Sequence, residues 1–261
     1  MVIRMKTFRT LAALVLAMAL SFSLAACSGG KSSEYDTVES GKLHMATNAQ
    51  FPPYEMTTDS GGYEGIDVEI ATAIASKLGL ELVVDDMDFK TVITAVQQGK
   101  SDMAMAGLTV DPEREKNVDF TASYATGVQV IIVTEDSDIA SVDDLDGKLI
   151  GVQEGTTGWM YCSDDYGDDA VVAYDNGSAA VQALLSGSVH CVVIDNEPAK
   201  AYVAANAGLK ILDTEYVIED YAIGVSKDNP ALREAINAAL EELISDGTVK
   251  KIVDRYIPPE G

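Results

Sequence analysis

The sequence predicts an α/β fold of two lobes joined by two strands. Strand-like and helix-like segments alternate in two blocks, residues 41–127 and 131–217, and such alternation is typical of a mostly parallel sheet covered by helices. A run rich in β-branched residues, Val128–Thr134, and a second isolated strand, Tyr221–Val225, border the second block and are candidates for the connections. We expect the last segment to return to the first lobe, which then comprises residues 41–127 plus 222–261.

The N-terminus has the order of a secretory signal peptide. Arg4, Lys6 and Arg9 give a basic start, and the apolar run Leu11–Ala26 follows. The run ends in small residues, as a cleavage site requires, and it is shorter than the roughly 20 apolar residues of a spanning helix. We therefore expect residues 1–26 to be a signal peptide; an uncleaved anchor helix is the alternative that the length disfavours.

Cys27 is a candidate for lipid attachment. The tetrapeptide Leu24-Ala-Ala-Cys27 resembles a bacterial lipobox, whose Cys is lipid-modified and becomes the first residue. Residues 28–33 (SGGKSS) are rich in Gly and Ser, which is typical of a flexible linker. The sequence thus predicts a tether over residues 27–40 and a lipid-anchored protein on the extracytoplasmic face of the cell membrane.

The charge of the chain excludes one class of partner. Residues 1–26 hold three cations and no acid, so the remainder carries 15 Lys and Arg against 42 Asp and Glu, a formal net charge of −27. Such a surface repels phosphate backbones, which argues against nucleic-acid binding. It also offers no polybasic patch for anionic lipid, so membrane attachment depends on the lipid anchor.

Cysteine and histidine suggest no metal site. Cys162 and Cys191 could form a disulfide in an oxidising compartment, although two buried free thiols is the simpler interpretation. His44 and His190 lack metal-ligand spacing and are expected to be structural. We expect no metal and no cofactor.

The first block begins with a strand at Lys42–Thr47. A helix follows at Ile66–Leu78, because Ile66, Ile70, Ile74 and Leu78 recur at a spacing of four. Asp67 is placed to cap its start and Gly79 to end it. The other segments of this block are expected as a strand at Leu80–Val84, a helix at Thr91–Gln98 ended by Gly99, and a strand at Ser101–Ala106.

The second block and the C-terminus continue the pattern. The expected elements are strands at Leu149–Val152, Val171–Ala173 and Val189–Ile194, a helix at Ser178–Leu185, and C-terminal helices at Ala231–Ser245 and Val249–Tyr256.

Seven motifs then carry a family resemblance. They are, in order, Asn48-Ala-Gln-Phe-Pro-Pro-Tyr-Glu55, Gly65-Ile-Asp-Val-Glu69, Gly107-Leu-Thr-Val-Asp-Pro-Glu-Arg114, Val118-Asp-Phe120, Gly151-Val-Gln-Glu-Gly-Thr-Thr157, Asp195-Asn-Glu-Pro198 and Asp246-Gly-Thr-Val-Lys-Lys-Ile252. Together they resemble the polar-amino-acid family of solute-binding proteins (bacterial extracellular solute-binding proteins, family 3), which serve ATP-binding-cassette importers.

The resemblance implies a periplasmic-binding-protein (Venus flytrap) fold with a ligand cleft between its lobes. It places hinge strands near 127–131 and 217–225, and lobe 2 at 131–217. Ligand would stabilise a closed form by its higher affinity for that form, and the permease subunits of the importer would recognise it. The implied ligand is a free amino acid and the protein a monomer.

The charges of an amino acid need partners once it leaves water. By the resemblance, Arg114 receives the α-carboxylate, for which a guanidinium fork is well matched. Asp195, directly after an apolar strand, receives the α-ammonium; it could also cap the next helix. A surface Arg balanced by neighbouring acids is the alternative for Arg114.

Further positions follow from the same resemblance. Gly107 and Thr109 match groups that contact the ammonium and carboxylate, and Thr157 lies where a helix N-terminus favours an anion; Thr156 is equally a plain cap. Phe51 and Phe89 match apolar walls, although each could be core. Trp159 and Tyr161 could shape the pocket from the second lobe.

Asn48 departs from many relatives, which carry an acidic residue at this point. An amide both donates and accepts hydrogen bonds without charge. The identity of the amino acid, cationic, neutral polar or cystine, therefore stays open.

Two other functions compete with transport. A sensor for a signalling receptor would use the same binding step. An enzyme on this fold would need a poised acid or base, for which Glu55, Asp195 and Glu197 are candidates, although each has a simpler binding or structural role.

Overall fold

The structure is a computed structural model that describes residues 35–213 and 216–259. The predicted signal peptide, residues 1–26, and the predicted lipidation site Cys27 lie outside the described residues. Within the described part, no helix combines the length and apolarity needed to cross a membrane.

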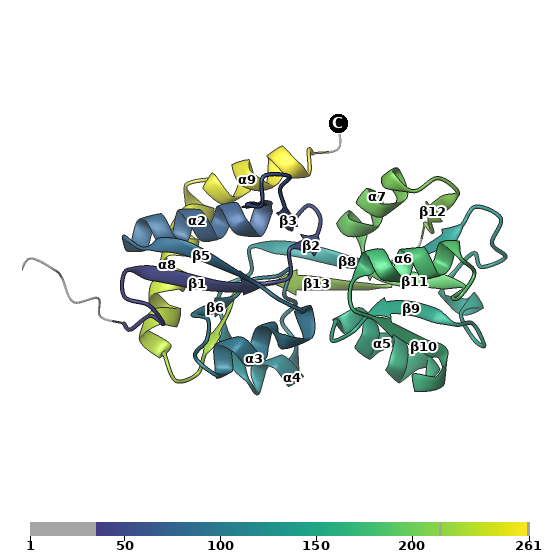
Figure 1. Ribbon diagram of the computed structural model, residues 1–261, viewed down its shortest axis with the longest axis horizontal. Coiled ribbons are helices and arrows are strands. Elements are labelled where there is room, and N and C mark those ends of the chain that lie inside the picture. The colour runs from purple at the N-terminus through teal and green to yellow at the C-terminus, as the bar shows by residue number, and fades with distance from the viewer. Residues whose placement is uncertain (1–34, 214–215, 260–261) are drawn as a thin grey trace, which may run out of the picture. The chain divides into compact units, whose positions relative to one another are not determined.

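The first lobe is built on a five-stranded mixed sheet (Figure 1). The sheet has the order β5-β1-β6-β14-β7; β1 is parallel to β5 and β6, whereas β14 is antiparallel to both of its neighbours. Its strands are β1 (Lys42–Thr47), β5 (Glu81–Asp86), β6 (Met103–Ala104), β7 (Val118–Phe120) and β14 (Gly224–Ser226).

Helices cover both faces of this sheet. On one face α2 packs against β1 and β5, and the C-terminal helices α8 and α9 pack on α2; α3 lies on the other face (Figure 1). The helices of this lobe are α2 (Ile66–Leu78), α3 (Val92–Gln97), α4 (Pro112–Glu115), α8 (Pro230–Ser245) and α9 (Thr248–Tyr256), with a 3-10 turn at Phe89–Thr91.

Helix α2 has the predicted bounds, but its start differs from the prediction. Ile66, Ile70 and Ile74 are buried, and Gly79 ends the helix in the left-handed conformation, as predicted. The N-cap is Gly65 with φ 130°, where a Cβ would lie 2.2 Å from the Tyr54 carbonyl oxygen. The prediction that Asp67 caps the helix is wrong, because its side chain turns inward.

The sequence analysis did not predict several short strands. A small antiparallel sheet consists of β2 (Gln50–Phe51), β3 (Glu55–Thr57) and β4 (Tyr63–Glu64). The strand predicted for Ser101–Ala106 is reduced to β6, although the N–H groups of Asp102 and Met105 still donate to the carbonyls of His44 and Ala46.

The second lobe is built on a six-stranded mixed sheet, in which β10, β9 and β11 are parallel and β8 is antiparallel to β11, β12 and β13. The strands are β8 (Ala125–Thr134), β9 (Ile150–Gln153), β10 (Val171–Tyr174), β11 (Cys191–Asp195), β12 (Leu209–Ile211) and β13 (Val217–Tyr221). The helices are α5 (Thr157–Tyr166), α6 (Gly177–Leu185) and α7 (Asn196–Ala205), with 3-10 turns at Val142–Asp144 and Asp168–Ala170.

Successive side chains of β11 point to opposite faces of the sheet and belong to two different apolar clusters. Val192 and Ile194 of β11 belong to the apolar cluster that includes residues of α6, whereas Cys191 and Val193 pack in the cluster of α5 with Cys162. Both cysteines are buried and their thiols are free.

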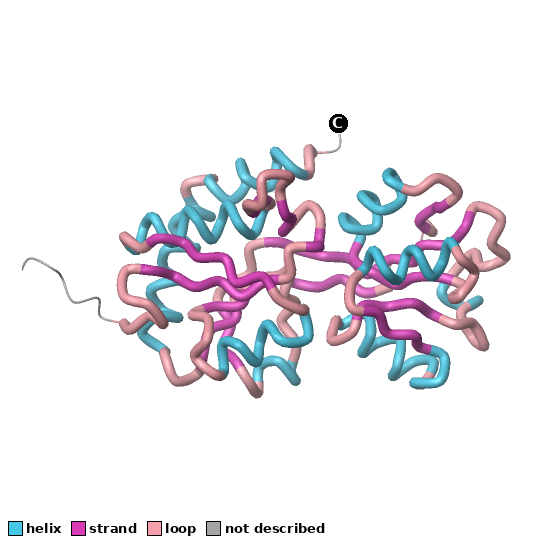
Figure 2. Tube along the Cα trace, viewed as in Figure 1, coloured by secondary structure: helices cyan, strands magenta, loops and turns pink. Residues whose placement is uncertain are grey.

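Two paired strands connect the lobes (Figure 2). β8 and β13 are antiparallel, with Tyr221 opposite Ala125 and Val217 opposite Gln129. The single strand predicted for Tyr221–Val225 is wrong: β13 ends at Tyr221, and β14 begins at Gly224 in the other sheet. The Ala222 N–H donates instead to the Leu108 carbonyl at 3.0 Å, so the chain changes sheets at this point.

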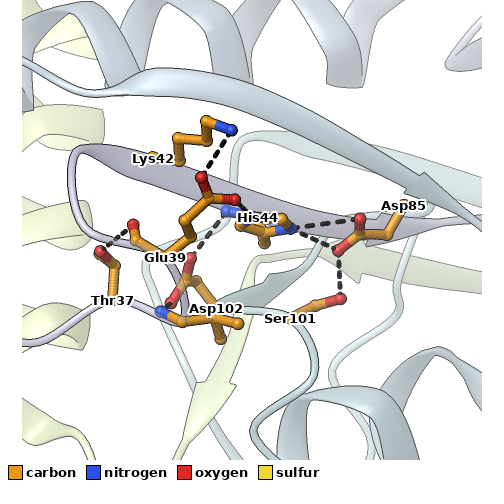
Figure 3. Close-up of polar contacts among 8 residues, drawn as sticks. Thr37, Glu39, Lys42, His44, Asp85, Ser101 and Asp102 are labelled. Carbon is orange, nitrogen blue, oxygen red and sulfur yellow. Dashed lines mark hydrogen bonds and ion pairs between the residues drawn. The ribbon is translucent and has the colours of Figure 1, made fainter.

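The end of the predicted tether is attached to the first lobe (Figure 3). The Asp102 carboxylate accepts the N–H groups of Val38 and His44, each at 2.7 Å. Glu39 pairs with Lys42 at 2.7 Å. The His44 ring bonds to Asp85 and His190 accepts the Leu149 N–H, so both histidines have structural roles. In the described ranges, no three His, Cys, Asp or Glu side chains are grouped as a metal site would require.

Candidate ligand-binding site

A cavity lies between the two lobes, and the structure brings all eight predicted ligand contacts to its wall. Its space is about 310 Å³, counted together with the part that is open to solvent. The lining consists of Asn48, Phe51, Phe89, Gly107, Thr109, Arg114, Thr157 and Asp195, together with Ala106, Gln153 and Thr156. The roles of these residues in binding stay a prediction.

Arg114 is held by contacts from both lobes. It lies in α4, whose N-cap residue Asp111 accepts the N–H groups of Glu113 and Arg114. Its side chain is 6 % exposed; Nη1 donates to the Thr109 carbonyl at 2.9 Å and Nη2 to the Gly155 carbonyl at 3.2 Å. These bonds use two of the five N–H donors of a guanidinium.

The surroundings of Arg114 favour an anionic ligand. Its guanidinium carbon lies 5.5 Å from the centre of the Phe89 ring, in the range of a cation–π contact. Burial lowers the pKa of Arg114, against the charges of Asp111, Glu219 and Asp195, yet an arginine stays charged in proteins. A buried cation with free donors is stabilised when a carboxylate binds to it.

Asp195 is a buried acid on the opposite lobe. It ends β11 at the N-cap position of α7, but its side chain makes no capping bond; it accepts the hydroxyl of Tyr221 instead. Burial raises the pKa of this carboxyl, and the neighbouring Glu219 raises it further. A cation bound here would relieve both effects.

The N-terminus of α5 also borders the cavity. Thr156 caps it: the Thr156 hydroxyl accepts the Trp159 N–H at 3.2 Å and donates to the Gln153 carbonyl at 2.8 Å. Thr157 is the first helical residue and is buried. The unpaired N–H groups and the dipole of a helix start favour negative charge at this place.

Gly107 and Thr109 are fixed by buried acids. Gly107 has φ +53°, its N–H donates to Asp67 Oδ2 at 2.8 Å, and a Cβ there would lie 2.7 Å from the Phe51 ring. The Thr109 hydroxyl donates to Glu219 at 3.2 Å.

Among the described residues, four hydrogen bonds or ion pairs join the lobes around the cavity, and we name them the closing contacts. Two of them are hydrogen bonds from lining residues. Arg114 donates to the Gly155 carbonyl, and Gln153 Nε2 donates to Asn48 Oδ1 at 3.1 Å. The others are the Lys90–Glu154 ion pair at 2.6 Å and the bond from the Tyr202 hydroxyl to the Gln50 carbonyl at 2.9 Å.

The sequence analysis missed Gln153 and Glu219. Gln153 ends β9, at the same carboxyl edge of the sheet as Asp195, and that position could have identified it. Glu219 gives no local signal, because its role depends on pairing with Thr109 and Gln129 from distant segments.

Four other residues that the sequence analysis singled out lie outside the lining. Neither Trp159 nor Tyr161 lines the cavity; Tyr161 stacks edge-on against Tyr216 instead. Of the candidate acid–base groups, Glu55 is fully buried outside the lining, and Glu197 pairs with Lys200 at 2.6 Å.

Two α/β lobes joined by paired strands, with a buried cation and a buried carboxylate facing one cavity, define a protein that binds a small solute. The chain belongs to the bacterial extracellular solute-binding proteins, family 3, whose family model matches residues 43–259. The predicted family and its two-lobed periplasmic-binding-protein fold are thereby confirmed.

Similar proteins cover nearly the same length. The chain is 33 % identical over 259 residues to the arginine-binding extracellular protein ArtP of Bacillus subtilis (strain 168), covering 95 % of this chain and 97 % of the relative. A solved structure of an ancestral arginine-binding protein bound to arginine has a TM-score of 0.79 and 43 % identity, covering 83 % of this chain and 98 % of the other. An ancestral arginine-binding protein bound to glutamine gives a TM-score of 0.79 and 42 % identity, covering 84 % and 99 %.

Proposed function

We propose that this protein captures a polar L-amino acid outside the cytoplasm and delivers it to an ATP-binding-cassette importer, without catalysing a reaction. The observation that carries the proposal is the buried pair of opposite charges, Arg114 and Asp195, on the wall of one cavity. A zwitterion supplies a counter-charge for each of the two residues: a carboxylate for Arg114 and an ammonium for Asp195. Relatives named for arginine binding support the same class of ligand.

In this proposal the α-carboxylate binds the free donors of Arg114 and the start of α5 at Thr157. The Thr109 hydroxyl already donates to Glu219, so the backbone N–H of Thr109 is the group that donates to the ligand carboxylate. The α-ammonium binds Asp195 and the Gly107 carbonyl.

The ligand side chain lies between the rings of Phe51 and Phe89 and reaches Asn48. These groups complete the proposed site.

Ligand and closing contacts act together. The moving bodies are residues 41–127 with 222–261 and residues 131–217, and the strands near 127–131 and 217–225 are the hinge. A ligand that touches both bodies stabilises the closed form by its extra affinity for that form. The importer's permease subunits then recognise the closed protein, which Cys27 holds at the membrane by its lipid.

A thermal-unfolding screen of the purified protein against the twenty amino acids and cystine tests the function. A ligand present at 100 times its Kd adds about 2.7 kcal/mol to the free energy of unfolding, or roughly 5–10 °C in Tm for a chain of this size. We expect at least one polar L-amino acid to give such a shift and its D-isomer to give none. If no amino acid raises the Tm, the protein is not an amino-acid receptor.

A further inference from the structure

The cavity contains a pair of amides whose function the proposal above leaves open. Asn48, which follows β1, and Gln153, which ends β9, meet across the lobes with 3.1 Å between Gln153 Nε2 and Asn48 Oδ1. They are 4 % and 5 % exposed. Each is held further by a backbone carbonyl, that of Met87 for Asn48 at 2.9 Å and that of Asp175 for Gln153 at 3.3 Å.

The charged residues of the lining decide which ligand side chains can find a counter-charge in the cavity. Among the eleven lining residues, Arg114 is the only cation and Asp195 the only acid. Both are taken by the backbone charges of an amino-acid ligand. The lining therefore has no carboxylate left for a cationic side chain and no cation left for an acidic one, and an unpaired buried charge is costly.

Three acids near the cavity are not part of its lining. Glu154 pairs with Lys90 at 2.6 Å, and Asp86 accepts the Ala49 N–H at 2.8 Å. Glu219 accepts two side-chain hydrogen bonds at Oε2, whereas its buried Oε1 has no hydrogen-bond partner among the described residues. None of the three therefore offers a carboxylate on the cavity wall to a cationic side chain.

We propose that the site selects amino acids with an uncharged polar side chain, of the glutamine type, and that Asn48 and Gln153 set this preference. The inference rests on the proposed function and narrows its ligand class. An amide donates and accepts, so two amides satisfy an uncharged polar group without leaving a buried charge. Preference for an uncharged ligand separates this chain from relatives whose names specify arginine.

Isothermal titration with L-glutamine and L-arginine tests the preference. The wild-type protein is expected to bind glutamine at least about tenfold more tightly than arginine, because only arginine buries an unpaired charge. Asn48→Asp supplies a carboxylate beside Gln153 and is expected to move the ratio of the two dissociation constants at least about tenfold toward arginine.

Gln98→Glu is the matched control, since it also replaces an amide by a carboxylate, on an exposed residue outside the lining. It should leave the ratio unchanged. Tighter binding of arginine by the wild-type protein overturns the inference while leaving amino-acid binding intact. An altered ratio in Gln98→Glu also overturns it, because the preference would then follow the overall charge of the protein and not the amide pair. Failure of every amino acid to bind contradicts the proposed function itself.

Discussion

Replacing Arg114 by alanine is expected to weaken amino-acid binding by about 2–5 kcal/mol, which is at least about 30-fold in Kd. The variant removes the buried cation that would receive the α-carboxylate, and the carboxylate would enter the cavity unpaired. It also removes the closing contact to Gly155 and the packing on Phe89. Isothermal titration with the amino acid selected by the thermal screen measures the loss.

Two further variants make this result specific. Arg114→Lys keeps the charge without the planar fork and should fall between the wild type and Arg114→Ala. Arg233→Ala removes a cation from α8, outside the cavity lining, and should leave the Kd unchanged. A wild-type Kd for Arg114→Ala would remove this residue from the site.

Asp67→Ala is expected to lower both the stability of the fold and the affinity for ligand. Asp67 is fully buried, and its Oδ2 accepts the Gly107 N–H and the Tyr124 hydroxyl, each at 2.8 Å. Leaving a buried donor without an acceptor costs about 1–3 kcal/mol, so the free energy of unfolding should fall by about 2–6 kcal/mol in urea denaturation. Affinity falls as well, because Gly107 lines the cavity.

Asp102→Ala is a matched control for that variant. Asp102 likewise accepts two hydrogen bonds, both from backbone N–H groups, but it lies outside the cavity lining. It should reduce stability and leave the Kd of the folded protein unchanged. Equal loss of affinity in both variants would show that Asp67 acts through general stability and not through Gly107.

The same carboxyl predicts a pH dependence of stability. Burial raises the pKa of Asp67 from its ordinary value of 3.8 to about 6. Between these values the folded chain binds more protons than the unfolded chain, so ionisation of Asp67 lowers the free energy of unfolding as the pH rises from about 4 to 6. Asp67→Asn should make this slope smaller than in the wild type.

Local patterns predicted the long elements of the fold well. The bounds of α2 and β1 agree with the sequence analysis, because a spacing of four and a short strand bounded by turns are local signals. The division between β13 and β14 has no such signal. It is set by pairing with Ala125 in one sheet and Ala104 in the other, which are contacts between segments far apart in the chain.

The site was predictable as far as its residues belong to recognisable motifs. The eight predicted contacts line one cavity, whereas their buried partners were missed. Asp67 illustrates the reason: an acid in the first turn of a helix is typical of a cap, and only the tertiary contacts to Gly107 and Tyr124, 40 and 57 residues away, give it another role. Gln153 was missed in the same way, since its amide partner is 105 residues away.

The crystal structure of the protein with its tightest-binding amino acid tests the central claim most directly. The claim is that one zwitterion joins the lobes by placing its carboxylate on the guanidinium of one and its ammonium on the carboxylate of the other. We expect a ligand carboxylate oxygen within about 3 Å of an Arg114 nitrogen and the ligand nitrogen within about 3 Å of an Asp195 oxygen. A ligand bound elsewhere, or touching only one of these two side chains, would contradict the account.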